Sequence, residues 1–282
     1  MPIDNFTLFI ISLAVTGCAV GFASGLLGIG GGFIMIPVQF WGLTMLGVDS
    51  TLAIRVAFGT NLLVIIPTAA IGAFVHNRKK SVIWKVSLFM ALTGVFGAYL
   101  GGVIATHVPG AYLRCIFGIF SVCISIRMLF SALSAVDELH ETSVKKCMAW
   151  GFPIGLLAGT LGVGGGGMSV PILVLKLRLS MHKALGTSSA LMIFISSGAV
   201  LSFFINGLSA EVPIPYTVGY ISWLQAALLM AGSIPMAIVG VRVAHRLNAR
   251  WIRNIFAVFV MASGLKMSGF FQIIEGLISY FS

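Results

Sequence analysis

Charged side chains are scarce in this chain of 282 residues, and acidic ones are the scarcest. Only 9% of the residues are charged, with seven acidic against 17 basic side chains, whereas 59% are hydrophobic. The mean hydropathy is +1.08. This composition excludes an ordinary soluble globular domain. We therefore expect an all-α polytopic membrane protein.

Cysteine pairs and a basic leader are also missing. The four cysteines form no CxxC pair, and Cys18, Cys115 and Cys123 lie within apolar segments, so we expect neither a metal site nor a disulfide. No ATP-binding motif is present, and we expect no cofactor. The apolar run from Phe6 to Leu27 lacks the positively charged start of a cleavable signal peptide, because the first basic residue is Arg55. We interpret this run as a retained membrane segment.

The net charge of +10 does not indicate a nucleic-acid partner. The basic residues lie in short gaps between apolar runs and not along one solvated face. Their distribution is typical of a membrane protein, in which basic loops determine orientation.

A glycine-rich stretch occurs twice. The segment Gly21–Pro37 recurs 134 positions later as Gly155–Pro171, with seven of its glycine and proline positions matched. Glycine runs inside apolar sequence break helices, since each glycine costs about 1 kcal/mol relative to alanine. Each copy is therefore predicted to be a helix, an irregular tip and a short second helix, at Phe6–Leu46 and Met148–Leu177.

Six further apolar runs are each about long enough to cross a 30 Å hydrocarbon core. They are Leu52–Val75, Val82–Thr106, Tyr112–Val136, Ala184–Ile205, Tyr216–Val241 and Ile252–Tyr280. The most polar interval, residues 137–146, separates a first repeat, residues 1–136, from a second, residues 147–282. Each repeat thus contains one glycine-broken hairpin and three transmembrane helices.

Basic residues predict the orientation. If consecutive spans cross the membrane in opposite directions, 13 of the 17 Lys and Arg side chains fall on the same side of it. This side is expected to be cytoplasmic. The loop Asn77–Ser81 then faces the cytoplasm, and both termini face outside. Because three spans per half is an odd number, the two halves are predicted to be inverted-topology repeats, as in many secondary transporters.

The helices that follow the glycine runs, Phe33–Leu46 and Met168–Leu177, are too short to cross the membrane. Their N-termini are expected to lie within it, where unpaired N–H groups attract anions. The candidate binding residues are Gly30, Gly31, Gly32, Gly164, Gly165 and Gly166. Alternatively, these glycines only permit close helix packing, as we expect for Gly21, Gly25, Gly155 and Gly159.

Small polar residues occupy matched positions in the next spans. Thr60 and Asn61 follow Gly59, and Thr187, Ser188 and Ser189 follow Gly186, at a spacing of 127. Their side chains could complete the hydrogen bonds of an oxyanion. The alternative is that they bond to carbonyls one turn back in their own helices.

Two cations also match, Arg127 and Lys266, at a spacing of 139. Both fall inside predicted spans, where a charge is costly and is usually paired, hydrated or functional. We expect Lys266, about 13 residues into its span, to attract the anion. For Arg127, ten residues before the polar linker begins at Asp137, snorkelling to the interface is the alternative.

The doubled motif Gly-Leu-Leu-Gly-Ile-Gly-Gly-Gly…Pro and Gly-Thr-Leu-Gly-Val-Gly-Gly-Gly…Pro, followed by Gly-Thr-Asn and Gly-Thr-Ser, resembles the sulfite exporter TauE/SafE family, also called toluene sulfonate uptake permeases. The resemblance covers essentially the whole chain. It implies a multi-pass transporter of a bacterial inner membrane that moves sulfur-containing anions such as sulfite or sulfonates. The copies differ at Phe33 against Gly167 and at Asn61 against Ser188, so the half-sites need not be equivalent.

The hypothesis is therefore a secondary transporter, and not an enzyme, for a small sulfur oxyanion. Its partners are that anion and the lipid bilayer, with a homo-oligomer possible. A passive anion channel is the first alternative. The second is an intramembrane enzyme that uses Ser188 or Ser189 with His182 as base, although His182 falls in a basic loop.

Overall fold

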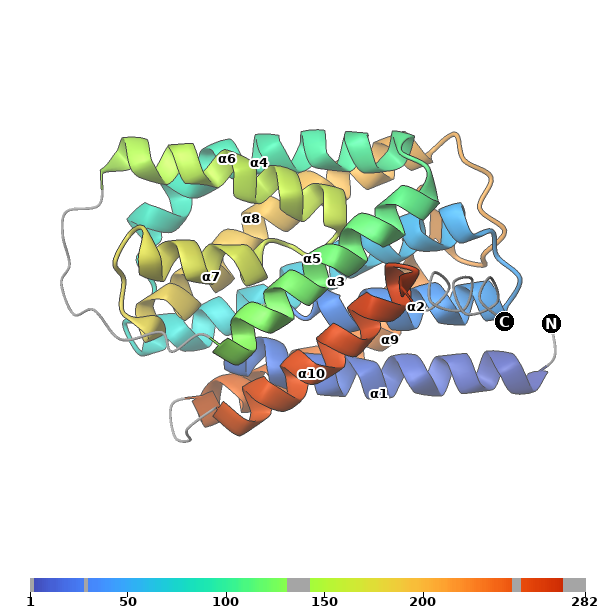
Figure 1. The fold of residues 1–282 in the computed structure, drawn as a ribbon, viewed down its shortest axis with the longest axis horizontal. Coiled ribbons are helices and arrows are strands. Elements are labelled where there is room, and N and C mark those ends of the chain that lie inside the picture. The colour runs from blue at the N-terminus through green and yellow to red at the C-terminus, as the bar shows by residue number, and fades with distance from the viewer. Residues whose placement is uncertain (1–2, 28–29, 131–142, 245–249, 271–282) are drawn as a thin grey trace, which may run out of the picture.

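The computed structural model describes residues 3–27, 30–130, 143–244 and 250–270, and these are predominantly helical (Figure 1). The first half contains α1 (Ile3–Leu27), α2 (Gly32–Met45), α3 (Ser50–Arg78), α4 (Trp84–His107) and α5 (Gly110–Phe130). The second half contains α6 (Val144–Leu161), α7 (Gly166–Leu175), α8 (Met181–Gly207), α9 (Trp223–Ala244) and α10 (Arg250–Met267). Two short strands, β1 (Thr217–Val218) and β2 (Ile221–Ser222), precede α9.

Six of the described helices are long and apolar enough to cross a membrane: α1, α3, α4, α5, α8 and α9. Helices α2 and α7, at 14 and 10 residues, are too short. The chain is thus a multi-pass integral membrane protein, as its composition predicts.

Glycine breaks separate α1 from α2 and α6 from α7, which confirms the predicted hairpins. The backbone is left-handed at Gly30 and Gly31 in the first break, and at Gly162, Gly164 and Gly165 in the second. Side chains other than glycine rarely adopt this conformation, so glycine is required here.

Each half packs onto the other through glycine. Helix α1 lies along α9, where Gly25 meets the backbone of Ala237, and α6 lies along α4, where Gly159 meets the backbone of Ala98. Gly21 and Gly155 make the corresponding contacts with Ser233 and Gly94. The predicted packing role of these four glycines is confirmed.

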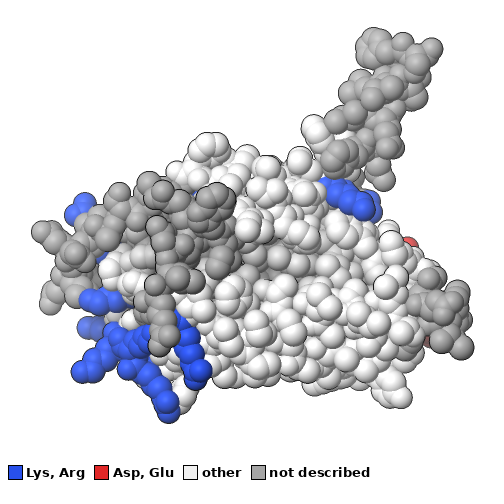
Figure 2. All heavy atoms as spheres, turned by 90° about the horizontal axis from the view of Figure 1, so that it is seen from below, with Lys and Arg blue, Asp and Glu red and all other residues white. Residues whose placement is uncertain are grey.

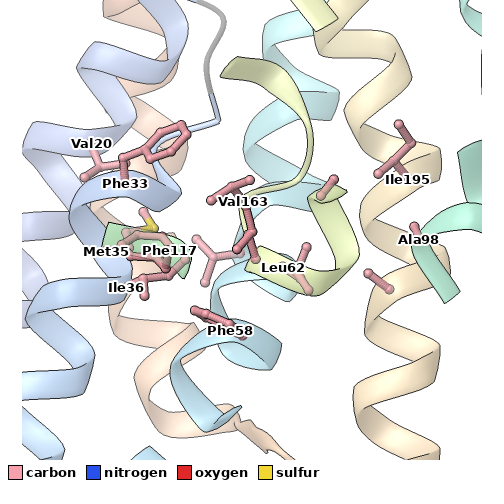
Figure 3. Packing of buried hydrophobic residues seen from close by; sticks show 14 of the residues in the cluster. Val20, Phe33, Met35, Ile36, Phe58, Leu62, Ala98, Phe117, Val163 and Ile195 are labelled. Carbon is pink, nitrogen blue, oxygen red and sulfur yellow. The ribbon is translucent and has the colours of Figure 1, made fainter. Parts of the chain in front are cut away.

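Aromatic side chains fill the centre of the bundle. Phe117 of α5 lies 6.2 Å from Phe33 of α2 and 5.9 Å from Phe58 of α3, between ring centroids. Phe203 of α8 meets Phe58 edge to face at 6.4 Å. Figure 3 shows Val163 of the second break among these apolar side chains, with Phe33 and Phe117 on one side of it. The core therefore surrounds the two breaks.

The basic residues gather at one end of the bundle. In Figure 1, the ends of α3, α5, α7 and α9 lie at that end with the starts of α4, α6, α8 and α10. In Figure 2, most of the visible Lys and Arg side chains cluster there. We call it the basic end. The opposite end carries the start of α1 and the end of α2.

The basic end is expected to face the cytoplasm. In a cysteine-free background, Lys79→Cys should resist an impermeant thiol reagent on intact cells, whereas Ser209→Cys should react, because both positions are exposed at opposite ends. Permeabilised cells serve as the control, in which both variants react. The reverse pattern on intact cells would contradict the orientation.

Two predicted spans differ from the structure. The span Tyr216–Val241 begins late, because residues 216–222 form a small antiparallel hairpin in which Val218 pairs with Ile221. Pro213, Pro215 and Gly219 explain why a helix does not form earlier, since proline and glycine disfavour helix interiors. The span Ile252–Tyr280 is interrupted, because α10 ends at Met267; residues 271–282 lie outside the described part, as do 131–142 of the linker region.

Asp49 caps helix α3. Its Oδ1 accepts hydrogen bonds from the backbone N–H groups of Leu52 (3.2 Å) and Thr51 (2.8 Å), which lower the pKa of this carboxyl. Because the pKa is lower in the folded protein, the carboxylate stabilises the fold fully at a pH above its unfolded-state pKa. This stabilisation is lost as the pH falls through the pKa of the folded protein.

Asp49→Ala should therefore reduce the stability of the purified protein by about 1 kcal/mol at neutral pH. Thermal unfolding in detergent would show a lower midpoint for Asp49→Ala and a smaller change for Asp49→Asn, which keeps an acceptor. The difference in thermal midpoint between wild type and Asp49→Ala should become smaller as the pH falls below about 4. A gap that is independent of pH would contradict a cap made by the carboxylate.

Candidate functional site

The two glycine breaks meet at the interface between the halves. A Cβ placed on Gly32 would lie 3.1 Å from the Cα of Val163, and one on Gly30 would lie 3.4 Å from the carbonyl oxygen of Val163. Asn61 of α3 closes this contact, because its Nδ2 donates to the carbonyl oxygen of Gly162 at 2.5 Å. The structure thus brings together residues separated by more than 100 positions in the sequence.

Each break precedes a helix N-terminus without a side-chain cap. Gly31 and Gly165 occupy the N-cap positions of α2 and α7, and neither can offer a capping side chain. The first N–H groups of an α-helix have no intrahelical partner, and they carry part of the positive end of its dipole. Gly32 and Gly166, the first residues of the two helices, are buried. Two electropositive backbone ends thus lie inside the protein.

Ser196 of α8 lies beside the candidate site and was not predicted from the sequence. Its hydroxyl is fully buried and has no hydrogen-bond partner among the described residues. A Cβ on Gly164 would lie 2.9 Å from this oxygen and 2.8 Å from Cδ1 of Ile65. The signal in the sequence was its position seven residues after Ser189, two turns along the same helix face. A free buried donor therefore stands beside the second break.

The two matched threonines bond to backbone groups of other segments. Thr60 Oγ1 accepts from the N–H of Ser222 at 2.9 Å, and Thr187 Oγ1 accepts from the N–H of Ile83 at 3.0 Å. Ile83 and Ser222 are themselves 139 positions apart, the spacing of the repeat in that region. The same contact therefore occurs twice, and each time it joins one half to the other.

The remaining small polar residues have different surroundings. Ser189 donates to the carbonyl of Leu185, one turn back, at 3.0 Å, as the alternative interpretation predicts. Ser188 shares a hydrogen bond of 2.6 Å with Ser169 of α7. Asn61 instead bonds across the halves, and its Oδ1 is buried without a partner among the described residues. The half-sites are thus unequal.

The structure does not bring Arg127 and Lys266 to the breaks. Both lie in the last turn of their helices, Arg127 in α5 and Lys266 in α10. Lys266 is exposed, and its Nζ lies 4.5 Å from the ring centroid of Trp41, which is nine residues or about 13 Å along α2 from Gly32. Arg127 lies ten residues, or about 15 Å, beyond the buried Phe117. Lys266 was expected about 13 residues into a longer helix, whereas α10 ends one residue after it, at Met267.

His182 does not share the burial of Ser188 and Ser189. It is exposed in the first turn of α8, whereas the two serines are buried about two turns farther along. Among the described residues, no group of three or more His, Cys, Asp or Glu side chains is placed to hold a metal ion.

The fold and its paired helix breaks define a multi-pass membrane protein with a candidate anion site between its halves. The family model described as "Sulfite exporter TauE/SafE" matches residues 13–267. The chain belongs to this family.

Relatives across bacteria and archaea are named as transporters. "Probable membrane transporter protein MJ0441" of Methanocaldococcus jannaschii is 27% identical over 269 residues, covering 93% of this chain and 97% of the relative. A "Probable membrane transporter protein" of Haemophilus influenzae is 25% identical, covering 93% and 98%. "Probable membrane transporter protein YunE" of Bacillus subtilis is 24% identical, covering 95% and 99%. The chain is thus similar to these probable transporters over nearly its whole length.

Proposed function

We propose that this protein is a secondary transporter for a small sulfur-containing oxyanion, such as sulfite or an organosulfonate. The observation that carries the proposal is the meeting of the two glycine breaks, each followed by an uncapped helix N-terminus, with the free hydroxyl of Ser196 beside the second break. Backbone N–H groups and a hydroxyl can donate hydrogen bonds to an oxyanion, whereas a fixed cation is not required.

The chemistry of the surroundings favours an anion over a cation. Gly30 and Gly164 are flanked by Met192 and Ile65, and carboxylates are absent from this part of the described structure. Apolar walls lower the local dielectric and strengthen each hydrogen bond to a charged ligand. Desolvation of the anion opposes binding, so weak, exchangeable binding is expected, as transport requires.

Alternating access of two inverted halves is the mechanism that we propose. It is supported by the exchange of contacts between halves, in which α1 packs on α9 as α6 packs on α4. It is also supported by the repeated hydrogen bonds of Thr60 and Thr187. In this mechanism, the bond from Asn61 to Gly162 joins the halves in the closed arrangement and breaks when they separate.

Counterflow in liposomes tests the proposal. Purified protein should take up labelled sulfite with saturation, and internal unlabelled sulfite should accelerate the uptake. A panel of sulfonates and sulfate would rank the substrates, and protein-free liposomes give the background. Uptake that rises linearly with concentration without acceleration would support a channel instead, and consumption of the anion without a gradient would support an enzyme.

A further inference from the structure

A groove with apolar walls lies between α1 and α2, at the end of the bundle opposite the basic end. Its volume is about 380 Å³. Its lining comes from the first half of α1, from the middle and end of α2, and from the residue that follows α2: Leu8, Phe9, Ser12, Val38, Trp41, Gly42, Met45 and Leu46. Leu8 is 66% exposed and Met45 is 79% exposed, so the groove opens on the outer surface of the helix bundle. It is separate from the breaks.

An apolar groove on a membrane-embedded surface is filled by apolar groups, because water has no hydrogen-bond partners there. Ser12 does not change this, since its hydroxyl donates to the carbonyl of Phe9 in its own helix at 2.7 Å. The chain of a lipid therefore fits the walls of the groove.

A cation stands at the edge of the groove. Lys266 Nζ lies over the ring of Trp41, a lining residue, at 4.5 Å from its centroid. Lys266 is exposed, and neither Asp49 nor Glu211, the acidic residues whose side chains the structure describes, is paired with it. An ammonium group over a ring still has N–H groups for a phosphate, and an indole N–H at a membrane interface is a further donor.

We propose that this groove is a binding site for an anionic phospholipid. One acyl chain lies between α1 and α2, and the phosphate of the head group contacts Lys266 and the indole of Trp41. The second half offers no equivalent, because Leu175 stands at the position that matches Trp41, 134 residues later. The site is therefore specific to one face of the membrane. This proposal does not rest on the transported substrate.

Fluorescence of Trp41 tests the site directly. The protein is reconstituted with brominated phosphatidylglycerol or brominated phosphatidylcholine at equal mole fractions, and the Trp41 signal is the difference between wild type and Trp41→Phe. Phosphatidylglycerol should quench this signal with about fivefold higher apparent affinity, since one Lys near a membrane surface contributes attraction of that size. The preference should decrease in high salt.

Charge variants separate the head group from the chain. Lys266→Met should remove the preference and leave quenching by both lipids, whereas Lys266→Arg should keep it. Lys85→Met is the matched control, because Lys85 is an exposed lysine at the basic end. Equal quenching by the two lipids in wild type would overturn the selection of an anionic head group. Failure of both lipids to quench Trp41 would overturn the site.

Discussion

Gly165→Leu should abolish anion uptake, with a loss on the order of 100-fold or more, while the protein remains folded in the membrane. Gly165 is the N-cap of α7 and has a φ of 84°. Its Cβ would lie 3.2 Å from Cγ2 of Ile154 and 3.4 Å from Cβ of Ala158, so a leucine would displace the break from its neighbours. Each hydrogen bond to a charged ligand contributes about 1.5–3 kcal/mol, so misplacing two N–H groups accounts for a loss of that order.

Gly47→Leu is the matched control for backbone strain. Gly47 has a φ of 85°, almost that of Gly165, but a Cβ there meets nothing within 4 Å. Both variants therefore incur a similar conformational cost of about 1–2 kcal/mol. Uptake into liposomes by monodisperse protein should be lost in Gly165→Leu and kept in Gly47→Leu. Normal uptake by Gly165→Leu would remove the second break from the site.

Gly31 is the N-cap of α2, as Gly165 is of α7, but Gly31→Leu is a less specific test of anion binding. A Cβ on Gly31 would collide with the side chain of Val20 in α1, so the packing of α1 against α2 would also change. We expect this variant to lose both transport and stability. A thermal midpoint measured beside the uptake distinguishes it from Gly165→Leu, where stability should decrease less.

Ser196→Ala should raise the anion concentration that gives half-maximal uptake by about tenfold or more, because a hydrogen bond to an anion contributes about 1.5–3 kcal/mol. Unlike a substitution that damages the fold, Ser196→Ala should not lower the thermal midpoint. The Ser196 hydroxyl is fully buried without a partner among the described residues, so its removal should leave the thermal midpoint unchanged or raise it. Reduced affinity in a protein of equal or greater stability would assign the hydroxyl to the ligand.

Ser197→Ala provides the comparison at the neighbouring position. Ser197 is exposed, and its hydroxyl donates to the carbonyl of Ile193 at 2.8 Å in its own helix. Concentration-dependent uptake by this variant should match wild type. If Ser196→Ala and Ser197→Ala have the same half-saturation as wild type, Ser196 does not contact the anion.

The architecture was readable from the sequence because its signals are local. Long apolar runs determine spans, glycine clusters determine breaks, and basic loops gather at one end; each depends on neighbouring residues alone. The sequence predicted that Gly25 and Gly159 pack closely against another helix, since small residues four apart permit close approach. The structure shows these contacts at Ala237 and Ala98. The sequence did not predict which helices they pack against, because contact between distant segments depends on the assembled fold.

Depth in the membrane was the main difficulty at the candidate site. Lys266 was placed deep in a span because the apolar run continues past it, but α10 ends one residue later, at Met267. Ser196 was overlooked for the converse reason: a single serine in an apolar helix is usually bonded to its own backbone, as Ser197 is. Only the position of Gly164 shows that Ser196 faces a break.

The central claim is that the anion binds where the two breaks meet, and accessibility at Ser196 tests it most directly. In a cysteine-free background, Ser196→Cys is reacted with an impermeant maleimide from each side of oriented vesicles. We predict that the residue reacts from both sides in turn, that a transported sulfonate slows the reaction in proportion to its occupancy, and that labelling stops transport. A labelled Ser196→Cys variant that transports at its unlabelled rate, with no protection by any transported anion, would contradict the claim.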